Sequence, residues 1–396
     1  MKKGRILIAG LIYLLVLEIV KVYFIMPFPG SQKINSINFA YFINTNILWL
    51  RLIGIMVVLF PIFHFVKNGS LAKKIILLAS IILYSTVFYL FNYRFLADKM
   101  FYQPKNILFA NSIIDTTNKN KLVIALTMNG KAKAYPIDII GYHHQIKDTI
   151  DGQPILVTYC TVCRTGRIYS PKINGIPQQF RLVGMDHFNA MFEDSITKSW
   201  WQQATGTAIT GKLKGKQLIE IPSRQMQLRD WIQLHPETTI LQSDSNFKQK
   251  YANLKGFDEG IIKSSLEKRD AGSWKFKSWI IGINLNGQSK AYDWNFLVKQ
   301  TLINDAIQET PVLITVEPNK KTFYALESMI NNQVLQFVTT SDSTKIRDLP
   351  TQSIWLRNGN CIDGKLKGMQ LKSIQAYQEF WHSWQYFHPN TSTFPK

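Results

Sequence analysis

Three long apolar stretches within the first hundred residues constrain the fold of this chain most strongly. They run from about Ile6 to Met26, from Ile47 to Val66 and from Ile75 to Leu96. Each is about as long as the stretch of roughly 20 apolar residues that a helix needs to cross a bilayer. A cleaved signal peptide fits the first stretch poorly, because its apolar part is too long and two more stretches follow. We therefore expect residues 1–100 to form a membrane anchor of three transmembrane helices.

The positive charges around these stretches predict the orientation of the anchor. Three of them precede the first stretch and three lie in the second short loop, whereas the first loop carries only Lys33. Since Lys and Arg are retained on the cytoplasmic side, the amino terminus should be cytoplasmic. We predict a multi-pass protein of the bacterial cytoplasmic (inner) membrane whose C-terminal domains are extracytoplasmic, a location in which cysteines can be oxidised.

Two charged residues, Glu18 and Lys21, interrupt the first apolar stretch. They are three positions apart and share a helix face, so they can pair or point into the bundle. Alternatively, Lys21 lies near the helix end and extends its amine to the membrane surface, which is the interpretation we favour.

The soluble part contains an internal repeat. Two landmarks recur after 157 residues, segments 129–135 and 154–158, and two recur after 153 residues, segments 211–215 and 235–236. Trp200 and Trp355 also occupy similar places. Four landmarks in one order predict two copies of one domain, at residues 101–255 and 256–396. The expected fold class is three N-terminal transmembrane helices followed by a β-rich α+β tandem-repeat ectodomain, each copy a twisted antiparallel sheet or open barrel with short helices.

Charge and motif content exclude several functions. The net charge is +20, yet no lysine- or arginine-rich run occurs, so we expect a basic surface and the lipid bilayer as partner rather than nucleic acid. A glycine-rich phosphate loop and an alternating βαβ pattern are also missing from the sequence, which argues against nucleotide binding.

Two of the three cysteines, Cys160 and Cys163, are two residues apart. We expect Cys160 to end a buried strand over residues 155–159 and Cys163 to lie in the following turn, with Gly166 letting the chain reverse. A nearby positive charge can activate such a thiol. The candidates for that charge are Arg164, Arg167 and His144.

Three interpretations of the pair remain open. In the first, one sulfur attacks a substrate disulfide or an oxidant and the other resolves the mixed intermediate, with no cofactor. In the second, Cys160, Cys163 and His144 bind zinc or copper and leave an open position. In the third, the pair forms an inert structural disulfide.

The second copy lacks these groups. At the offset of 157 residues, Cys160, Cys163 and His144 fall on Glu317, Lys320 and Thr301. Because all three side chains are missing together from the second copy, they are expected to share one role. This weakens the interpretation of the cysteine pair as an inert structural disulfide.

Other candidate residues have simpler explanations. Trp201 and Gln202 are candidates to line the site, whereas Trp200 is expected in the core. His235 recurs as His388 and is expected to be structural. Cys361 is expected to be a lone buried thiol.

The cysteine pair belongs to a wider pattern that resembles the bacterial domain-of-unknown-function family 3179. The matching motifs are His144-x-Ile146-x-Asp148, Gly152-x-Pro154, Tyr159-Cys160-x-x-Cys163, Ser199-Trp200-x-Gln202, Gly206, Gly211-x-Leu213-x-Gly215 and His235-Pro236. The resemblance covers about residues 105–245, and the second copy looks like a degenerate member. Selenocysteine replaces a cysteine of the pair in some members, so the resemblance implies redox chemistry more readily than structural zinc.

We therefore predict a thiol-disulfide redox module; the alternatives are a module that binds zinc or copper and a purely structural cell-envelope module, each using the same three side chains. Cys160 and Cys163 would carry the chemistry, His144 would tune or deprotonate a thiol, and Arg164 would stabilise a thiolate. Protein thiols or small oxidants would be its reaction partners.

Overall fold

The structure is a computed structural model that describes residues 2–395, and the chain divides into two compact units. The membrane unit comprises the residues up to Tyr102 together with Gln178–Gln217. The cysteine unit comprises Gln103–Pro177 together with the residues from Leu218 onward. These units are defined by packing, and the division into sequence domains at residues 100 and 255 stays a prediction.

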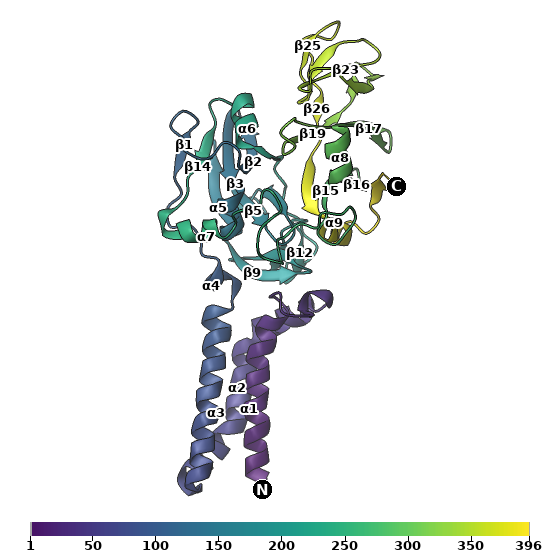
Figure 1. Cartoon of the computed structure of the whole chain (residues 1–396). Helices are drawn as coiled ribbons and strands as arrows, with labels where there is room; N and C mark the ends of the chain where they lie inside the picture. The colour runs from purple at the N-terminus through teal and green to yellow at the C-terminus, as the bar shows by residue number, and fades with distance from the viewer. Residues whose placement is uncertain (1, 396) are drawn as a thin grey trace. The chain divides into compact units, whose positions relative to one another are not determined.

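Three long helices dominate the membrane unit and lie side by side in Figure 1. They are α1 (Lys2–Tyr23), α2 (Ile37–Asn68) and α3 (Leu71–Tyr89), the last continuing through a π-type turn to Arg94. All three are long and apolar enough to cross a membrane, as the sequence predicts. A short helix, α4 (Ala97–Met100), follows them.

A polar cluster is buried between these helices. The Glu18 carboxylate accepts two hydrogen bonds from the Arg51 guanidinium, each 2.7 Å long. Lys21 is 8% exposed and donates to Asn92 Oδ1 at 2.5 Å, so the expectation that its amine extends to the membrane surface is wrong. Lys21 turns inward because Asn92 and Glu18 offer oxygen acceptors within a bundle that is otherwise apolar.

The membrane unit also holds a four-stranded sheet in the order β12-β11-β10-β9. Its strands are β9 (Phe180–Asp186), β10 (Asn189–Asp194), β11 (Trp200–Gln202) and β12 (Ala208–Thr210). The Met185 N–H donates to the Ile25 carbonyl oxygen at 2.8 Å. A Cβ atom on Gly184 would lie 2.1 Å from that same oxygen, so only glycine permits this close docking.

The cysteine unit begins with a series of short strands and helices. They are β1 (Phe109–Asn111), β2 (Leu122–Met128), β3 (Lys131–Pro136), α5 (Ile137–His143), β4 (Gln145–Ile150), β5 (Gln153–Cys160), β6 (Thr165–Tyr169), β7 (Lys172–Ile173) and β8 (Ile176–Pro177). After the membrane-unit sheet come β13 (Arg224–Gln227), α6 (Leu228–Leu234), β14 (Thr239–Leu241) and α7 (Lys248–Ala252). The predicted hairpin around Asn129 and Gly130 is confirmed, and both residues have positive φ, 50° and 77°.

A second series follows in the same order of elements. It contains β15 (Trp279–Leu285), β16 (Gln288–Asp293), α8 (Trp294–Gln300), β17 (Leu302–Ile307), β18 (Thr310–Val316), β19 (Phe323–Glu327), β20 (Met329–Ile330), β21 (Gln333–Val334), β22 (Phe337–Thr339), β23 (Lys345–Asp348), β24 (Ile354–Leu356), β25 (Cys361–Asp363), β26 (Lys372–Ser373), β27 (Ala376–Phe380), α9 (Trp381–Phe387) and β28 (Ser392–Phe394). Its sheet β28-β16-β15-β27 has the strand order of β14-β3-β2-β13 in the first series.

Several small sheets make up the fold. The pairs β3–β14 and β16–β28 are parallel, and the hairpin sheets β4-β5-β6 and β17-β18-β19-β26 are separate from them. The expectation of one twisted antiparallel sheet or open barrel is therefore wrong. Glycine and turn residues end most strands after a few residues, which keeps each sheet small.

Tryptophan side chains anchor the matching sheets of the two series. The Trp201 indole donates to Asp194 Oδ2 at 3.0 Å, and the Trp355 indole donates to Asp348 Oδ2 at 2.9 Å. Trp355 therefore corresponds to Trp201 and not to Trp200, whose indole donates to Glu193. The sequence alone cannot tell which of two adjacent tryptophans matches Trp355, because neighbouring residues of a strand point to opposite faces of the sheet.

Candidate functional site

The two cysteines lie on the turn that joins β5 to β6. Cys160 is the last residue of β5 and pairs with Thr165, the first residue of β6. Arg164 completes the turn in the left-handed conformation, with φ of 55°, and its N–H donates to the Thr161 carbonyl oxygen at 3.3 Å. The predicted strand followed by a turn is confirmed, but Arg164 rather than Gly166 adopts the backbone conformation that reverses the chain.

Gly166 has a different role, which is close packing. A Cβ atom at this position would lie 2.6 Å from Cδ1 of Ile124 on β2. Strand β2 therefore packs closely against β6 next to the cysteine turn. A larger residue at position 166 would push β2 or β6 out of place.

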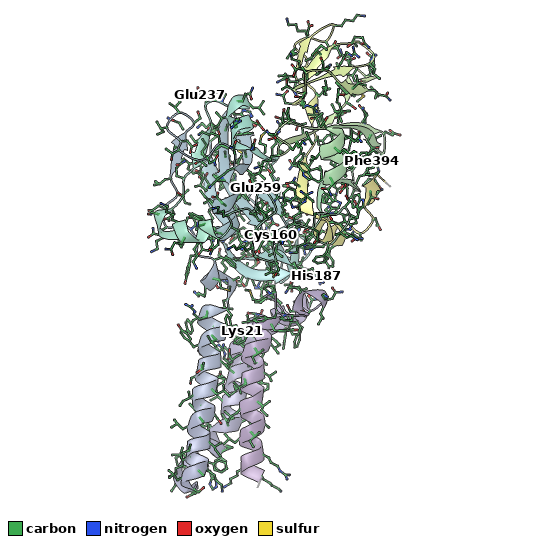
Figure 2. The ribbon with its side chains drawn as sticks, in the orientation of Figure 1. Lys21, Cys160, His187, Glu237, Glu259 and Phe394 are labelled. Atoms are coloured by element: carbon green, nitrogen blue, oxygen red, sulfur yellow. The ribbon has the colours of Figure 1, made fainter. Side chains whose placement is uncertain are left out.

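Both cysteines are buried in the cysteine unit, where Figure 2 labels Cys160. Cys160 and Cys163 expose none of their surface, and neither is in a disulfide. The structure therefore holds the pair as two thiols. Buried thiols react slowly with large reagents, so a small reactant or an opening of the covering residues is needed.

His144 is held against the strand that carries Cys160. Its backbone carbonyl accepts the Tyr159 N–H at 3.0 Å, and its ring Nδ1 lies 2.9 Å from the Tyr159 carbonyl oxygen. A carbonyl only accepts, so Nδ1 carries the proton and Nε2 is left as the acceptor of the neutral ring. Burial lowers the pKa of His144 to about 4, against a smaller opposing effect of that hydrogen bond.

The neutral ring cannot supply a positive charge near pH 7. The expectation that His144 contributes such a charge is therefore wrong, because burial in the protein interior disfavours the imidazolium. Its role in tuning or deprotonating a thiol stays a prediction.

Arg164 uses its guanidinium to hold other parts of the unit. Its Nε donates to Gln378 Oε1 at 2.9 Å, and its Nη1 donates to the Phe257 carbonyl oxygen at 3.1 Å. The guanidinium carbon lies 3.8 Å from the ring centroid of Trp279. These contacts fasten the turn to the second series, and the prediction that Arg164 stabilises a thiolate gains no support from them.

Arg167 is likewise committed to an ion pair. Its Nη2 lies 2.5 Å from Glu379 Oε1, and both side chains are at most 2% exposed. The guanidinium carbon also lies 3.3 Å from the ring centroid of Tyr377. Glu379 holds the pKa of Arg167 above its usual value despite the opposing effect of burial.

Residues of the second series cover the cysteine turn. The Phe380 N–H donates to the Cys163 carbonyl oxygen at 3.0 Å, and the His382 ring Nε2 lies 3.2 Å from the Val162 carbonyl oxygen. Burial lowers the pKa of His382 to about 4, so this ring is also neutral near pH 7. Sequence reasoning missed both residues, since they follow the turn by more than two hundred positions.

Lys277 is a basic residue of the second series that interacts electrostatically with both cysteines. It is 9% exposed and donates to the Leu266 carbonyl oxygen. Burial lowers the pKa of Lys277, whereas Glu267 and the two cysteines raise it. Lys277 and the two cysteines therefore interact electrostatically within the cysteine unit.

The described residues offer no set of side chains that could bind a metal ion. Within residues 2–395, His, Cys, Asp and Glu side chains form no group of three that could hold a metal ion. This includes the predicted set of Cys160, Cys163 and His144.

The remaining candidates lie away from the turn in sequence. Trp201 is core, and Gln202 donates to Asp186 in the membrane unit; their predicted contribution to the site stays a prediction. His388 stacks on Trp384, and His235 packs at a tilt against Trp231, as expected of structural residues. Cys361 is buried as predicted, and burial raises the pKa of its thiol.

Comparison with known proteins gives one match. A family model described as protein of unknown function (DUF3179) matches residues 108–391. The match includes both series of strands and therefore extends beyond the predicted range of 105–245. No curated protein and no solved structure matches this chain significantly.

Proposed function

This chain belongs to the DUF3179 family of proteins of unknown function, and from that premise we propose that it is a membrane-anchored thiol redox module. Cys160 and Cys163 would cycle between two thiols and one disulfide. The observation that carries this proposal is the presence of both thiols on one short turn that interacts electrostatically with Lys277. The alternative of a metal-binding module has less support, because no group of three His, Cys, Asp or Glu side chains among residues 2–395 could hold a metal ion.

The proposed step is a two-electron reduction of a small disulfide. The thiolate of Cys160 attacks one substrate sulfur, the substrate S–S bond breaks, and one substrate thiolate leaves. The thiolate of Cys163 then attacks Cys160 in the mixed disulfide, and the second substrate thiolate leaves. The substrate gains two electrons, the protein pair loses them, and the two protons from the cysteines pass through solvent to the released thiolates.

The burial of the pair argues for a small substrate. Both sulfurs are covered, and the backbone around them is bound by Phe380 and His382 of the second series. A folded protein substrate would require this cover to open, whereas a low-molecular-weight disulfide requires only a narrow path.

Lys277 would stabilise the negative charge of the thiolate at this site. Its ammonium stabilises whichever thiolate forms, and its own burial strengthens that interaction because water screens it less. The neutral Nε2 of His144 would accept the thiol proton.

We also infer that the two series are copies of one domain, of which only the first keeps the reactive residues. Support comes from the matching strand orders and from the left-handed conformation shared by His144 and Thr301, with φ of 59° and 62°. The Tyr159 N–H donates to the His144 carbonyl oxygen, and the Val316 N–H donates to the Thr301 carbonyl oxygen in the same way. Glu317, the next residue, then corresponds to Cys160. The turn that follows spans the same number of residues in both copies, because Tyr159 pairs with Gly166 and Val316 pairs with Phe323, so Lys320 stands at the position of Cys163.

We place both copies outside the bacterial cytoplasmic membrane. This follows from the positive charges before α1 and between α2 and α3, which favour the cytoplasmic side. An odd number of crossings then carries the rest of the chain to the oxidising side, where a thiol pair needs an electron donor to stay reduced.

A single-turnover reaction tests the redox proposal. Full-length protein in detergent, reduced and carrying Cys361→Ser to remove the third thiol, is mixed with oxidised glutathione. We expect two glutathione thiols released per chain and an internal disulfide between Cys160 and Cys163. Cys163→Ser should stop at the mixed disulfide after one thiol. Release of no glutathione, with both cysteines still open to alkylation after denaturation, would overturn the proposal.

A further inference from the structure

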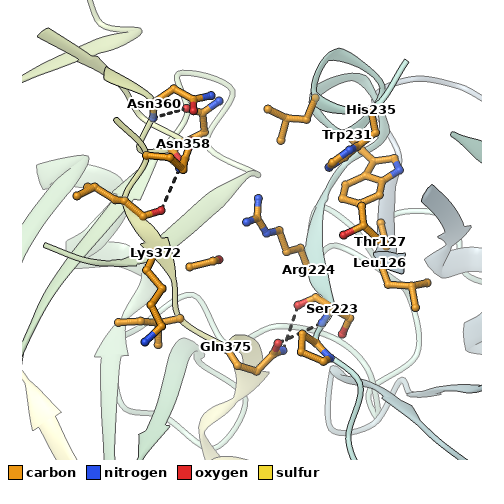
Figure 3. A pocket seen from close by; sticks show the side chains of 17 residues that line it. Leu126, Thr127, Ser223, Arg224, Trp231, His235, Asn358, Asn360, Lys372 and Gln375 are labelled. Carbon is orange, nitrogen blue, oxygen red and sulfur yellow. Dashed lines mark hydrogen bonds between the residues drawn. The ribbon is translucent and has the colours of Figure 1, made fainter. Parts of the chain in front are cut away.

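A cleft in the cysteine unit separates the first series from the second. Its volume is about 720 Å³, which lies within the range of small-molecule sites. One wall carries Arg224 at the start of β13 together with Trp231 of α6 and His235, the residue after that helix. The other wall comes from the loops before and after β25 and from β26, as Figure 3 shows.

Arg224 is the dominant charge of this cleft. Figure 3 shows its side chain extending into the space between the two walls. Its guanidinium makes no hydrogen bond or ion pair with any residue between 2 and 395. Burial lowers the pKa of Arg224, against a smaller opposing effect of Tyr324.

None of the residues lining the cleft is an aspartate or glutamate. The other two basic residues there are His235 and Lys372. Burial and the charge of Arg224 lower the pKa of His235, so its ring is neutral near pH 7. Lys372 is 81% exposed at its side chain and pairs with Glu327 at 3.2 Å. The unbalanced charge therefore resides on Arg224.

Other buried arginines of the same unit have partners. Arg167 pairs with Glu379, and Arg357 donates to the carbonyl oxygens of Ser343 and Thr301. A partly buried guanidinium without such partners has unused donors that a bound anion can accept from. This contrast distinguishes Arg224 from the structural arginines.

The floor of the cleft is fixed before any ligand binds. Ser223 and Gln375 join the two walls through two hydrogen bonds, N–H to Oε1 and Nε2–H to the carbonyl oxygen, each 3.1 Å long. Apolar side chains flank this link, among them Leu126, Leu371 and Ile374. The site thus combines an apolar lining with one unpaired cation.

We propose that the cleft binds a small organic anion, with its carboxylate or phosphate on Arg224 and its apolar body against the leucine and isoleucine side chains. This site is separate from the cysteine turn and does not depend on the redox proposal.

Calorimetric titration of the full-length protein in nanodiscs of zwitterionic lipid tests this site. The probes are benzoate and phenyl phosphate, with benzyl alcohol as the neutral counterpart, all at one ionic strength. Wild type should bind at least one of the two anions and bind the alcohol much more weakly. Arg224→Met should lower the anion affinity about tenfold or more, because a charge-assisted hydrogen bond is lost.

Two further variants test whether the guanidinium of Arg224 itself binds the anion. Arg224→Lys should retain part of the affinity, and Arg229→Met should bind like wild type, because Arg229 is paired with Asn120 outside the cleft lining. A melting temperature for Arg224→Met at or above that of wild type without ligand would show that this variant folds. Equal anion affinity in wild type and Arg224→Met, or binding of neither anion to wild type, would overturn the proposal.

Discussion

The imidazole Nδ1 of His144 lies 2.9 Å from the carbonyl oxygen of Tyr159, the residue immediately before Cys160. This contact and the Tyr159 N–H bond to the His144 carbonyl fasten the ring one peptide away from the first thiol. The proposed base is thus positioned by the same strand that carries the proposed nucleophile.

The neutral buried histidines make stability depend on pH. The pKa values of His144 and His382 are each about 4 in the folded chain and about 6.5 when unfolded. Between these values the unfolded chain binds more protons, so stability is present above about pH 6.5 and is lost as pH falls toward 4. Each histidine should contribute a loss of roughly 3 kcal/mol across this range.

Denaturant unfolding at several pH values measures this effect. His382→Gln should show a shallower pH dependence than wild type, because the buried ring that takes up a proton on unfolding is gone. Identical slopes for wild type and His382→Gln would contradict the account of a buried neutral ring.

Replacement of Lys277 should slow the chemistry of the thiols. Lys277→Met removes an ammonium that interacts with both sulfurs, so thiolate formation should become less favourable. The pH profile of alkylation by iodoacetamide should shift upward accordingly, whereas Lys275→Met, at an exposed neighbouring position, should leave it unchanged. A profile unaffected by Lys277→Met would remove this residue from the site.

The Arg167–Glu379 pair should be a strong link within the cysteine unit. Glu379→Gln removes the nearer of two carboxylates around this buried guanidinium, since Glu220 Oε1 lies 3.6 Å from Arg167 Nε, and should cost about 3 kcal/mol of unfolding free energy. The double variant Arg167→Met with Glu379→Gln should recover much of that loss, because the buried guanidinium is removed together with its main partner. A double-mutant cycle with no coupling energy would refute this prediction.

Glu18 should be needed for assembly of the membrane unit. Glu18→Leu leaves Arg51 and Lys21 without the carboxylate that balances them between the helices. We expect a lower melting temperature in detergent, whereas Ile19→Leu, at an exposed neighbouring position, should behave like wild type. Equal melting temperatures for Glu18→Leu and wild type would argue that the cluster contributes nothing.

Local sequence patterns were sufficient to predict several parts of the fold. The apolar stretches predict the three long helices, and Asn129-Gly130 predicts its hairpin, since both depend on neighbouring residues. The cysteine turn was predictable for the same reason.

The surroundings of the turn were not predictable in this way. Phe380, His382 and Lys277 reach it from the second series, and no local pattern encodes contacts over such separations. Arg164 illustrates the opposite error. Its place beside Cys163 suggests a role toward the thiols, yet the faces of Trp279 and Phe257 and the Gln378 amide hold its guanidinium.

An equilibrium redox titration of Cys160 and Cys163 tests the central claim most directly. Full-length Cys361→Ser protein is equilibrated in thiol–disulfide buffers of graded potential, trapped with an alkylating agent after rapid denaturation, and analysed by mass spectrometry. Our account predicts that both cysteines lose reactivity together in one two-electron transition and that the product is the internal disulfide. Persistence of both thiols in the most oxidising buffer would contradict it.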